Sequence, residues 1–351
     1  MSESLLLSCR SGFENDCAAE IQFHANQLGI SGFARTKNEQ GFVEFECFTA
    51  GDALAIHRKL DFRELVFTRQ WQVVYQKLHL NPDDRISEIL SLSQSWGKCS
   101  QFAQDYPDTN SGKQLSGFCR KFHKPLQKAL VPFLESSSDY ILQLFWLDSQ
   151  MLYLGVRLAS NSSPYPMGIL RLKQPSVAPS RSTLKLDEAF AVLLNEDERA
   201  RYIQPGQHAV DLGACPGGWS YQLIRRSMYV DAIDNGPMAE HLMESGQLTH
   251  YREDGFKFVP SRKNVSWLVC DMVEKPSRVT RLMLKWLLSG WCKYAIFNLK
   301  LPMKKRFAEV QQDLSLLREE LSQTGYRFEV RAKQLYHDRE EITVFACLHR
   351  D

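Results

Sequence analysis

One glycine-rich stretch constrains the fold of this chain more than any other part of its sequence. It reads Val-Asp-Leu-Gly-Ala-Cys-Pro-Gly-Gly-Trp-Ser over residues 210–220, and apolar residues then recur at helical spacing. This order predicts a buried parallel strand, a tight turn and the start of a helix. At the carboxyl edge of an open α/β sheet such a turn lets the backbone approach a ligand, because glycine has no Cβ.

The spacing of the glycines argues against a dinucleotide cofactor. Dinucleotide sites carry G-x-G-x-x-G, so that pyrophosphate meets the helix N-terminus, whereas this chain has G-x-x-x-G-G with Pro216 inside. NAD and FAD are therefore disfavoured. A glycine turn that only packs the strand against the helix remains an alternative at this point.

Composition limits the class and location of the protein. The 351 residues leave room for two or three domains, and 44% hydrophobic with 24% charged residues is ordinary for a soluble globular chain. No apolar run approaches the roughly 20 residues of a membrane span, and the first residues do not resemble a signal peptide. The nine cysteines are scattered without C-x-x-C. We therefore expect a cytoplasmic protein with reduced thiols, no bound metal and no membrane contact.

Hydrophobic patterns predict three folded parts and a linker. Residues 1–76 show the order βαββαβ, which is typical of an α+β ferredoxin-like module. Residues 77–160 predict a second α+β unit, with one helix starting at Asn110, another at Pro125 and a hairpin about residues 148–150. Residues 161–181 form a linker rich in proline and serine and free of acidic residues. Residues 182–351 alternate strands and helices, which predicts a parallel sheet covered on both faces.

Basic residues gather in the second unit and in the linker. The formal net charge is only +2, so attraction to nucleic acid must come from local patches. Between Asp108 and Glu135 the chain has no acid but five clustered cations, Lys113, Arg120, Lys121, Lys124 and Lys128. Phosphate contact is one interpretation, and a solvated helix face is the other.

Acidic residues follow the predicted strands of the last part. Asp234 comes about 20 residues after the glycine turn, where an acid commonly binds ribose hydroxyls, although it could instead cap the next helix. Asp254 closes the third strand and could contact an adenine amino group. Asp271 ends the fourth strand, but it lacks the Pro-Pro-aromatic sequence that usually accompanies methylation of a base amino group. Cytosine C5 methylation needs a nucleophilic cysteine, and Cys270 is expected to point into the sheet.

Two lysines and two acids from separate elements are expected to converge at the same carboxyl edge. Asp271 and Lys300 end strands, Glu341 opens the last strand, and Lys185 lies early in a predicted helix. A purely structural cluster of salt bridges is the alternative.

The motifs of the last part of the chain resemble those of a known family of enzymes. Residues 182–351 resemble the S-adenosylmethionine-dependent RNA ribose 2'-O-methyltransferases of the FtsJ type, which are marked by a Lys-Asp-Lys-Glu tetrad. The whole chain resembles the bacterial RlmM family, which methylates a cytidine ribose of 23S rRNA, in the blocks at residues 179–190, 211–219, 252–258, 298–305 and 335–341. That family carries a ferredoxin-like module and a THUMP RNA-binding domain before its methyltransferase domain.

The resemblance implies a Rossmann-like class I methyltransferase domain over residues 182–351 and a THUMP domain over 77–160. It implies Lys300 as the general base, helped by Lys185, Asp271 and Glu341. Glu341 is preferred to Glu340 because the family's acid directly opens the final strand. The methyl donor S-adenosylmethionine, with S-adenosylhomocysteine as product, is expected against Ser182, Cys215, Pro216, Gly217, Gly218, Asp234, Asp254 and Asp271.

The implied substrate is a cytidine in the peptidyl-transferase region of 23S rRNA, either naked or in an assembly intermediate, and the protein is expected to be a monomer. Lys300 must be neutral to accept a proton, and we expect Lys185 to lower its pKa by repulsion while Asp271 opposes that effect. Two alternatives remain open: a catalytically inactive assembly factor that binds the donor, and a small-molecule methyltransferase.

Overall fold

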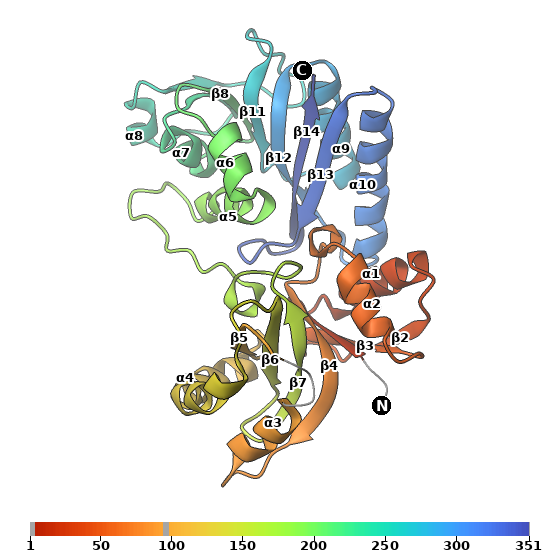
Figure 1. Ribbon diagram of the computed structural model, residues 1–351. Coiled ribbons are helices and arrows are strands. Elements are labelled where there is room, and N and C mark those ends of the chain that lie inside the picture. The colour runs from red at the N-terminus through yellow and green to blue at the C-terminus, as the bar shows by residue number, and fades with distance from the viewer. Residues whose placement is uncertain (1–3, 94–97, 351) are drawn as a thin grey trace. The chain divides into compact units, whose positions relative to one another are not determined.

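The chain forms two compact units, which comprise residues 1–170 and 171–351 (Figure 1). The computed structural model describes residues 4–93 and 98–350. Each unit contains a seven-stranded sheet. The division between the units falls within the predicted linker of residues 161–181. Within the described residues, each helix is too short or too polar to cross a membrane.

The N-terminal unit opens with the predicted βαββαβ order. Its elements are β1 (Ser4–Ser8), α1 (Glu14–Gln27), β2 (Gly32–Arg35), β3 (Phe42–Cys47), α2 (Asp52–Lys59), a 3₁₀ turn (Phe62–Glu64) and β4 (Gln70–His79). β1 lies between β3 and β4 and is antiparallel to both. The sheet continues, because β4 also pairs with β7. The predicted module boundary at residue 76 thus falls within a strand that both parts of the unit share.

The second part of this unit completes the sheet in the order β2-β3-β1-β4-β7-β6-β5. Its elements are α3 (Arg85–Ser93), β5 (Gln101–Asp105), α4 (Asn110–Leu130), β6 (Tyr140–Trp146), β7 (Met151–Leu158) and two 3₁₀ turns (Val131–Phe133 and Pro166–Gly168). β6 and β7 form the predicted hairpin.

Helix α4 differs from its prediction. The helix begins after Thr109, whose hydroxyl accepts the Gly112 N–H at 3.0 Å, but no second helix starts at Pro125. One helix runs through the proline. Cys119 precedes Pro125 and Leu126 follows it, and both are buried, so a single helix keeps its apolar side packed on both sides of the proline. We infer that this burial outweighs the loss of one backbone hydrogen bond.

The C-terminal unit is a sheet in the order β10-β9-β8-β11-β12-β14-β13. The strands are β8 (His208–Leu212), β9 (Tyr229–Ile233), β10 (Leu248–Tyr251), β11 (Val265–Cys270), β12 (Cys292–Lys300), β13 (Arg327–Lys333) and β14 (Glu341–His349). The five strands from β8 to β12 are parallel, and β14 runs antiparallel between β12 and β13. The strand order reverses beside β8, so the crevice for a ligand is expected at the carboxyl ends of β8 and β11.

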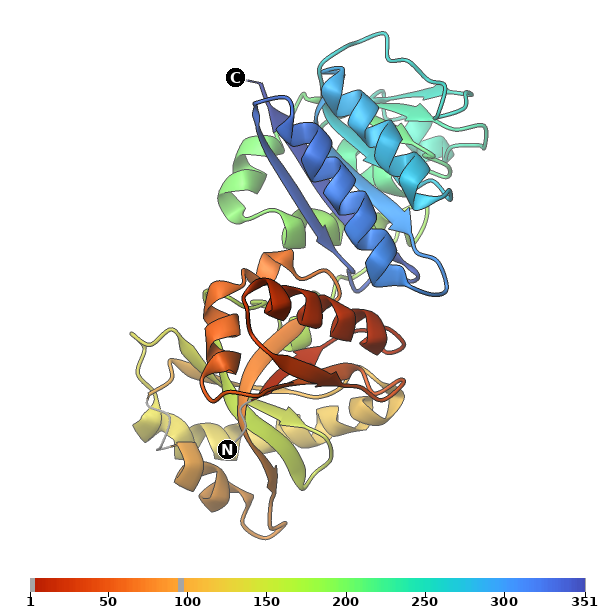
Figure 2. The same ribbon diagram turned by 90° about the vertical axis from the view of Figure 1, so that its right-hand side faces the viewer.

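Helices cover both faces of this sheet. They are α5 (Thr183–Leu193), α6 (Glu196–Tyr202), α7 (Gly218–Ile224), α8 (Glu240–Met243), α9 (Pro276–Leu288) and α10 (Arg306–Ser322). On one face Phe190, Tyr202 and Trp219 of α5, α6 and α7 pack with Trp267 and Phe345 of the strands. On the other face lie α9 and α10, which Figure 2 shows in front of the sheet. This buried core holds the strand ends in fixed positions.

Candidate active site

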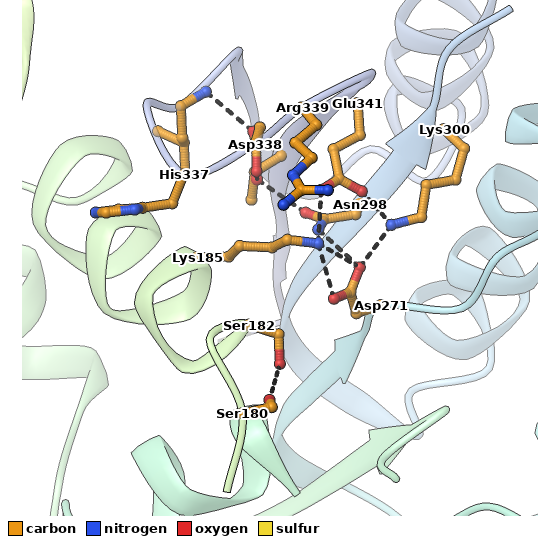
Figure 3. Close-up of polar contacts among 12 residues, drawn as sticks. Ser180, Ser182, Lys185, Asp271, Asn298, Lys300, His337, Asp338, Arg339 and Glu341 are labelled. Carbon is orange, nitrogen blue, oxygen red and sulfur yellow. Dashed lines mark hydrogen bonds and ion pairs between the residues drawn. The ribbon is translucent and has the colours of Figure 1, made fainter. Parts of the chain in front are cut away.

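Four charged side chains meet at the carboxyl edge of the C-terminal sheet (Figure 3). Each comes from a different element: Lys185 from the first turn of α5, Asp271 from the end of β11, Lys300 from the end of β12 and Glu341 from the start of β14. Lys300 and Glu341 are directly opposite each other in the β12–β14 pair. Because β11 and β12 are parallel neighbours, Asp271 also reaches this point.

The four side chains form a closed ring in which positive and negative charges alternate. Lys185 Nζ lies 3.0 Å from Asp271 Oδ2 and 2.5 Å from Glu341 Oε1. Lys300 Nζ lies 2.8 Å from Asp271 Oδ1 and also pairs with Glu341 Oε2. None of the four side chains is more than 24% exposed, so solvent and salt screen these charges weakly.

The ring changes the expected electrostatics of Lys300. Burial acts to lower the pKa of Lys300, but the charges and hydrogen bonds of Asp271 and Glu341 outweigh it and hold that pKa above its usual value. The sequence leaves the direction of the pKa change open, because Lys185 and Asp271 act in opposite directions; in the structure the two carboxylates that contact the amine decide it. Burial likewise raises the pKa of Asp271, but Lys300 and Lys185 bring it below the usual value.

The glycine turn packs against other parts of the protein. Gly217 adopts φ 113°, which is the left-handed region. A Cβ on Gly217 would lie 2.3 Å from Leu242 Cδ1, and one on Gly218 would lie 2.2 Å from Ser182 Oγ. Protein side chains therefore lie where the Cβ atoms of these two residues would be. The missing Cβ atoms therefore allow the turn to lie against α8 and the start of α5.

Ser182 lies at the start of α5, beside the turn. Its hydroxyl does not cap the helix, contrary to what its position suggests. Ser182 Oγ instead lies 2.7 Å from Ser180 Oγ (Figure 3).

The turn also holds the carboxylate of Asp234, which follows β9. Cys215 N–H donates to Asp234 Oδ2 at 3.0 Å, and Gly236 N–H donates to Oδ1 at 2.8 Å. The alternative role of Asp234 as a helix cap fails, because α8 begins after Ala239 without a side-chain cap. Asp254 is exposed and accepts Phe256 N–H at 2.9 Å. Each carboxylate oxygen has a further lone pair, so both residues fit a ligand with hydroxyl or amino groups.

Some residues that organise this site are not apparent from the sequence. Asn298 Nδ2 donates to Asp271 Oδ1 at 2.9 Å. Glu188 accepts the backbone N–H groups of Tyr336 and His337 at 2.9 and 3.0 Å, and so ties the loop before Glu341 to the helix that carries Lys185. In the sequence, only the position of Asn298 two residues before Lys300 indicates that both side chains lie on the same face of a strand.

A separate cluster lies at the far ends of β13 and β14. The ligand atoms of Glu329, Cys347 and His349 are within 4.8 Å of one another. His349 Nε2 lies 3.4 Å from Cys347 Sγ and 3.3 Å from Glu329 Oε1, and Glu329 pairs with Arg331. Hydrogen bonds and this ion pair account for the cluster, and we assign no metal to it.

Comparison with known proteins identifies the class of protein. Residues 178–305 match the family described as FtsJ-like methyltransferase, and this range includes the glycine turn, Asp271 and Lys300. The C-terminal unit is thus a methyltransferase domain of the FtsJ-like class. Residues 1–72 match the RlmM ferredoxin-like domain, and residues 84–158 match the N-terminal domain of ribosomal RNA large subunit methyltransferase M.

Relatives cover nearly the whole chain. The ribosomal RNA large subunit methyltransferase M of Yersinia enterocolitica is 52% identical over 98% of this chain and 95% of its own length. That of Yersinia pestis is 51% identical over the same shares. The chain therefore belongs to the ribosomal RNA large subunit methyltransferase M family, and the predicted family, fold class and kind of enzyme are confirmed.

Solved structures are more distant. TrmN from Thermus thermophilus aligns with 99% of this chain and 100% of its own at 11% identity and a TM-score of 0.33. At that score the alignment adds nothing to the family assignment.

Asp211 is a buried acid on β8, just before the glycine turn. Ser220 Oγ donates to its Oδ2 at 2.7 Å. Burial raises the pKa of Asp211 to about 7, and the nearby charge of Asp271 adds to the rise, whereas the Ser220 hydrogen bond opposes it. The folded protein therefore holds this proton to higher pH than the unfolded chain does.

We predict that Asp211→Asn reduces the pH dependence of stability. A carboxylic acid whose pKa is higher in the folded than in the unfolded state stabilises the fold fully at any pH below its unfolded-state pKa. This contribution is lost as pH rises towards the folded-state pKa of about 7. The free energy of unfolding should lose up to about 1.4 kcal/mol per pH unit in that window through this group. Urea unfolding between pH 5 and 8 measures the slope. An unchanged slope in Asp211→Asn would contradict the raised pKa.

Proposed function

We propose that this protein transfers a methyl group from S-adenosylmethionine to the ribose 2'-hydroxyl of a cytidine in 23S rRNA, with Lys300 as the general base. The observation that carries the proposal is the closed ring of Lys185, Asp271, Lys300 and Glu341 at the carboxyl edge of an FtsJ-like domain. Residues 182–351 would perform the transfer. Residues 77–160 and the linker 161–181 would hold the RNA.

The proposed donor site surrounds the glycine turn. Asp234 is oriented by two backbone N–H groups and keeps lone pairs for ribose hydroxyls, while exposed Asp254 has lone pairs for an adenine amino group. The bound donor supplies an electrophilic methyl group on a positively charged sulfur. The residues proposed to contact it are Ser182, Cys215, Pro216, Gly217, Gly218, Asp234, Asp254 and Asp271.

Lys300 must accept the proton of a ribose hydroxyl, which is a poor nucleophile at neutral pH. The 2'-oxygen forms a bond to the methyl carbon as the carbon–sulfur bond breaks, and its proton passes to Lys300 Nζ. Because the pKa of Lys300 is raised, its neutral form is a minor species at neutral pH. A positioned base contributes about 10²- to 10⁴-fold, and alignment of the two reacting atoms supplies much of the remaining acceleration.

Exposed cations in both units are proposed to bind RNA phosphates. Lys113, Arg120, Lys121, Lys124 and Lys128 of α4 are all exposed, as are Lys304 and Lys305 after β12. Proteins read RNA mainly at accessible single strands and by shape, so we propose naked or partly assembled 23S rRNA as the substrate. We also propose that the protein acts as a monomer in the cytoplasm.

We predict that Lys300→Ala strongly slows methyl transfer but leaves donor binding intact, because the amine acts on the hydroxyl and not on the donor. Single-turnover transfer from labelled S-adenosylmethionine to unmodified 23S rRNA should fall by about 10²- to 10⁴-fold. Calorimetry with S-adenosylhomocysteine should give an unchanged affinity. Lys293→Ala, an exposed lysine on the same strand, serves as the control.

Nucleoside mass spectrometry of the product separates the alternatives. Label in 2'-O-methylcytidine supports the proposal, and label on a base contradicts it. If the wild-type protein binds donor and RNA without transfer, the inactive assembly factor is favoured. Transfer only to small molecules would favour a small-molecule methyltransferase.

We predict that Glu341→Gln shifts the pH profile of methyl transfer towards lower pH. The wild-type rate should rise with pH, because deprotonation of Lys300 produces the base. Glu341 is one of two carboxylates that raise the pKa of Lys300, so its loss makes the amine deprotonate at lower pH. Glu340→Gln is the matched control, since Glu340 pairs with Arg306 outside the ring. Equal shifts in both variants would contradict the assignment of Glu341.

We predict that Lys121→Ala combined with Lys124→Ala weakens RNA binding and its salt dependence. Each lost phosphate contact should reduce the slope of log affinity against log salt by roughly one. The control is the double variant Lys37→Ala with Lys59→Ala, which removes the same charge from exposed positions of the N-terminal unit outside α4. Filter binding to 23S rRNA fragments between low and high salt measures both slopes. Equal slopes in the two double variants would favour a solvated helix face.

A further inference from the structure

Asp271 receives a hydrogen bond from a residue that does not titrate. Asn298 Nδ2 donates to Asp271 Oδ1 at 2.9 Å, beside the Lys300 contact on the same oxygen at 2.8 Å. Asn298 is 0% exposed and lies two residues before Lys300, on the same face of β12. In the β12–β14 pair Asn298 is opposite Thr343, just as Lys300 is opposite Glu341. The buried polar pair Asn298–Thr343 therefore lies next to the charged pair Lys300–Glu341 along the two strands.

The orientation of the Asn298 amide follows from its two neighbours. Its Nδ2 faces a carboxylate, which only accepts, so the amide oxygen must face the other way. That oxygen, Oδ1, lies 2.8 Å from Thr343 Oγ1. The reversed amide would place two acceptors together at Asp271. The single hydrogen of the Thr343 hydroxyl is therefore donated to Asn298.

Asp338 continues the chain of hydrogen bonds beyond Thr343. Thr343 Oγ1 lies 3.1 Å from Asp338 Oδ1 and 3.0 Å from Oδ2. The Thr343 hydrogen is already used, so a favourable contact here needs a hydrogen on Asp338. Asp338 is 1% exposed, and Leu335 N–H donates to its Oδ2 at 2.9 Å. A neutral carboxylic acid at this position would supply that hydrogen.

The surroundings of Asp338 favour its protonated form. Burial raises the pKa of Asp338 well above its usual value, and the charges of Glu341 on β14 and Glu188 on α5 raise it further. The Leu335 N–H and the charge of Lys185 act in the opposite direction.

We propose that protonated Asp338, Thr343 and Asn298 form a hydrogen-bonded relay that orients Asp271 within the ring. All three are positioning residues, and the inference rests on the proposed role of that ring in methyl transfer. The direction of donation is fixed along the chain, from Asp338 through Thr343 and Asn298 to Asp271. Asp271 then keeps one donor whose strength does not depend on the protonation state of Lys300. The carboxylate can hold its position when Lys300 gains or loses a proton.

Near-isosteric substitutions in the full-length protein test the relay. Thr343→Val removes the hydroxyl at similar size, and Thr343→Ser keeps it. Asp338→Asn keeps a donor towards Thr343 but cannot ionise. We expect Thr343→Val to lower the single-turnover rate on unmodified 23S rRNA by about 10- to 100-fold, as for a misplaced reacting group, with S-adenosylhomocysteine affinity unchanged. Thr343→Ser and Asp338→Asn should remain near the wild-type rate.

Thermal unfolding of each variant checks that the fold is intact. A wild-type rate in Thr343→Val, or an equal loss in Asp338→Asn, would overturn the relay. A second measurement does not depend on activity: the infrared difference between wild type and Asp338→Asn at neutral pH should contain a carboxylic acid carbonyl band. Its absence would mean that Asp338 is ionised and would also overturn the inference. A wild-type protein without methyl transfer would refute the proposed function, while the infrared result would still decide the protonation of Asp338.

Discussion

The closed ring of two lysines and two carboxylates depends on the whole architecture of the C-terminal unit. Its members come from a helix, two parallel strands and an antiparallel strand, so the ring forms only when all four elements are in register. A buried charge without its partner is strongly unfavourable, and each member therefore stabilises the position of the others. The same contacts raise the pKa of Lys300 and favour its ammonium form, so the proposed role of Lys300 as general base requires that these contacts change before it accepts a proton.

Aspartates perform different tasks in this domain because their surroundings differ. Asp271 contacts two lysines and an amide, and its pKa lies below the usual value. Asp211 lies beneath the turn with one hydroxyl donor, and burial raises its pKa to about 7. Asp234 is held by backbone N–H groups at the rim. The surroundings of one residue type thus lower the pKa of one carboxyl, raise that of another and orient a third through backbone N–H groups.

The sequence predicts the meeting of Lys185, Asp271, Lys300 and Glu341 because strand ends converge in a parallel sheet. It does not predict the hydrogen bond between Asn298 and Thr343, which are 45 positions apart, because this contact depends on the register of the antiparallel strands β12 and β14. It also misplaces a helix start at Pro125, where burial of the flanking residues overrides a local rule. The sign of the pKa change at Lys300 required the actual distances to both carboxylates.

Strand β4 has a consequence for how the N-terminal unit folds. One of its edges is paired with β1 and the other with β7, so the two halves of the unit are covalently and cooperatively joined through a central strand. A fragment that ended at residue 76 would leave buried residues such as Val73 and Val74 beside an unpaired edge. Open apolar edges promote aggregation. The two modules are therefore expected to unfold together, as one cooperative unit, despite their separate family matches.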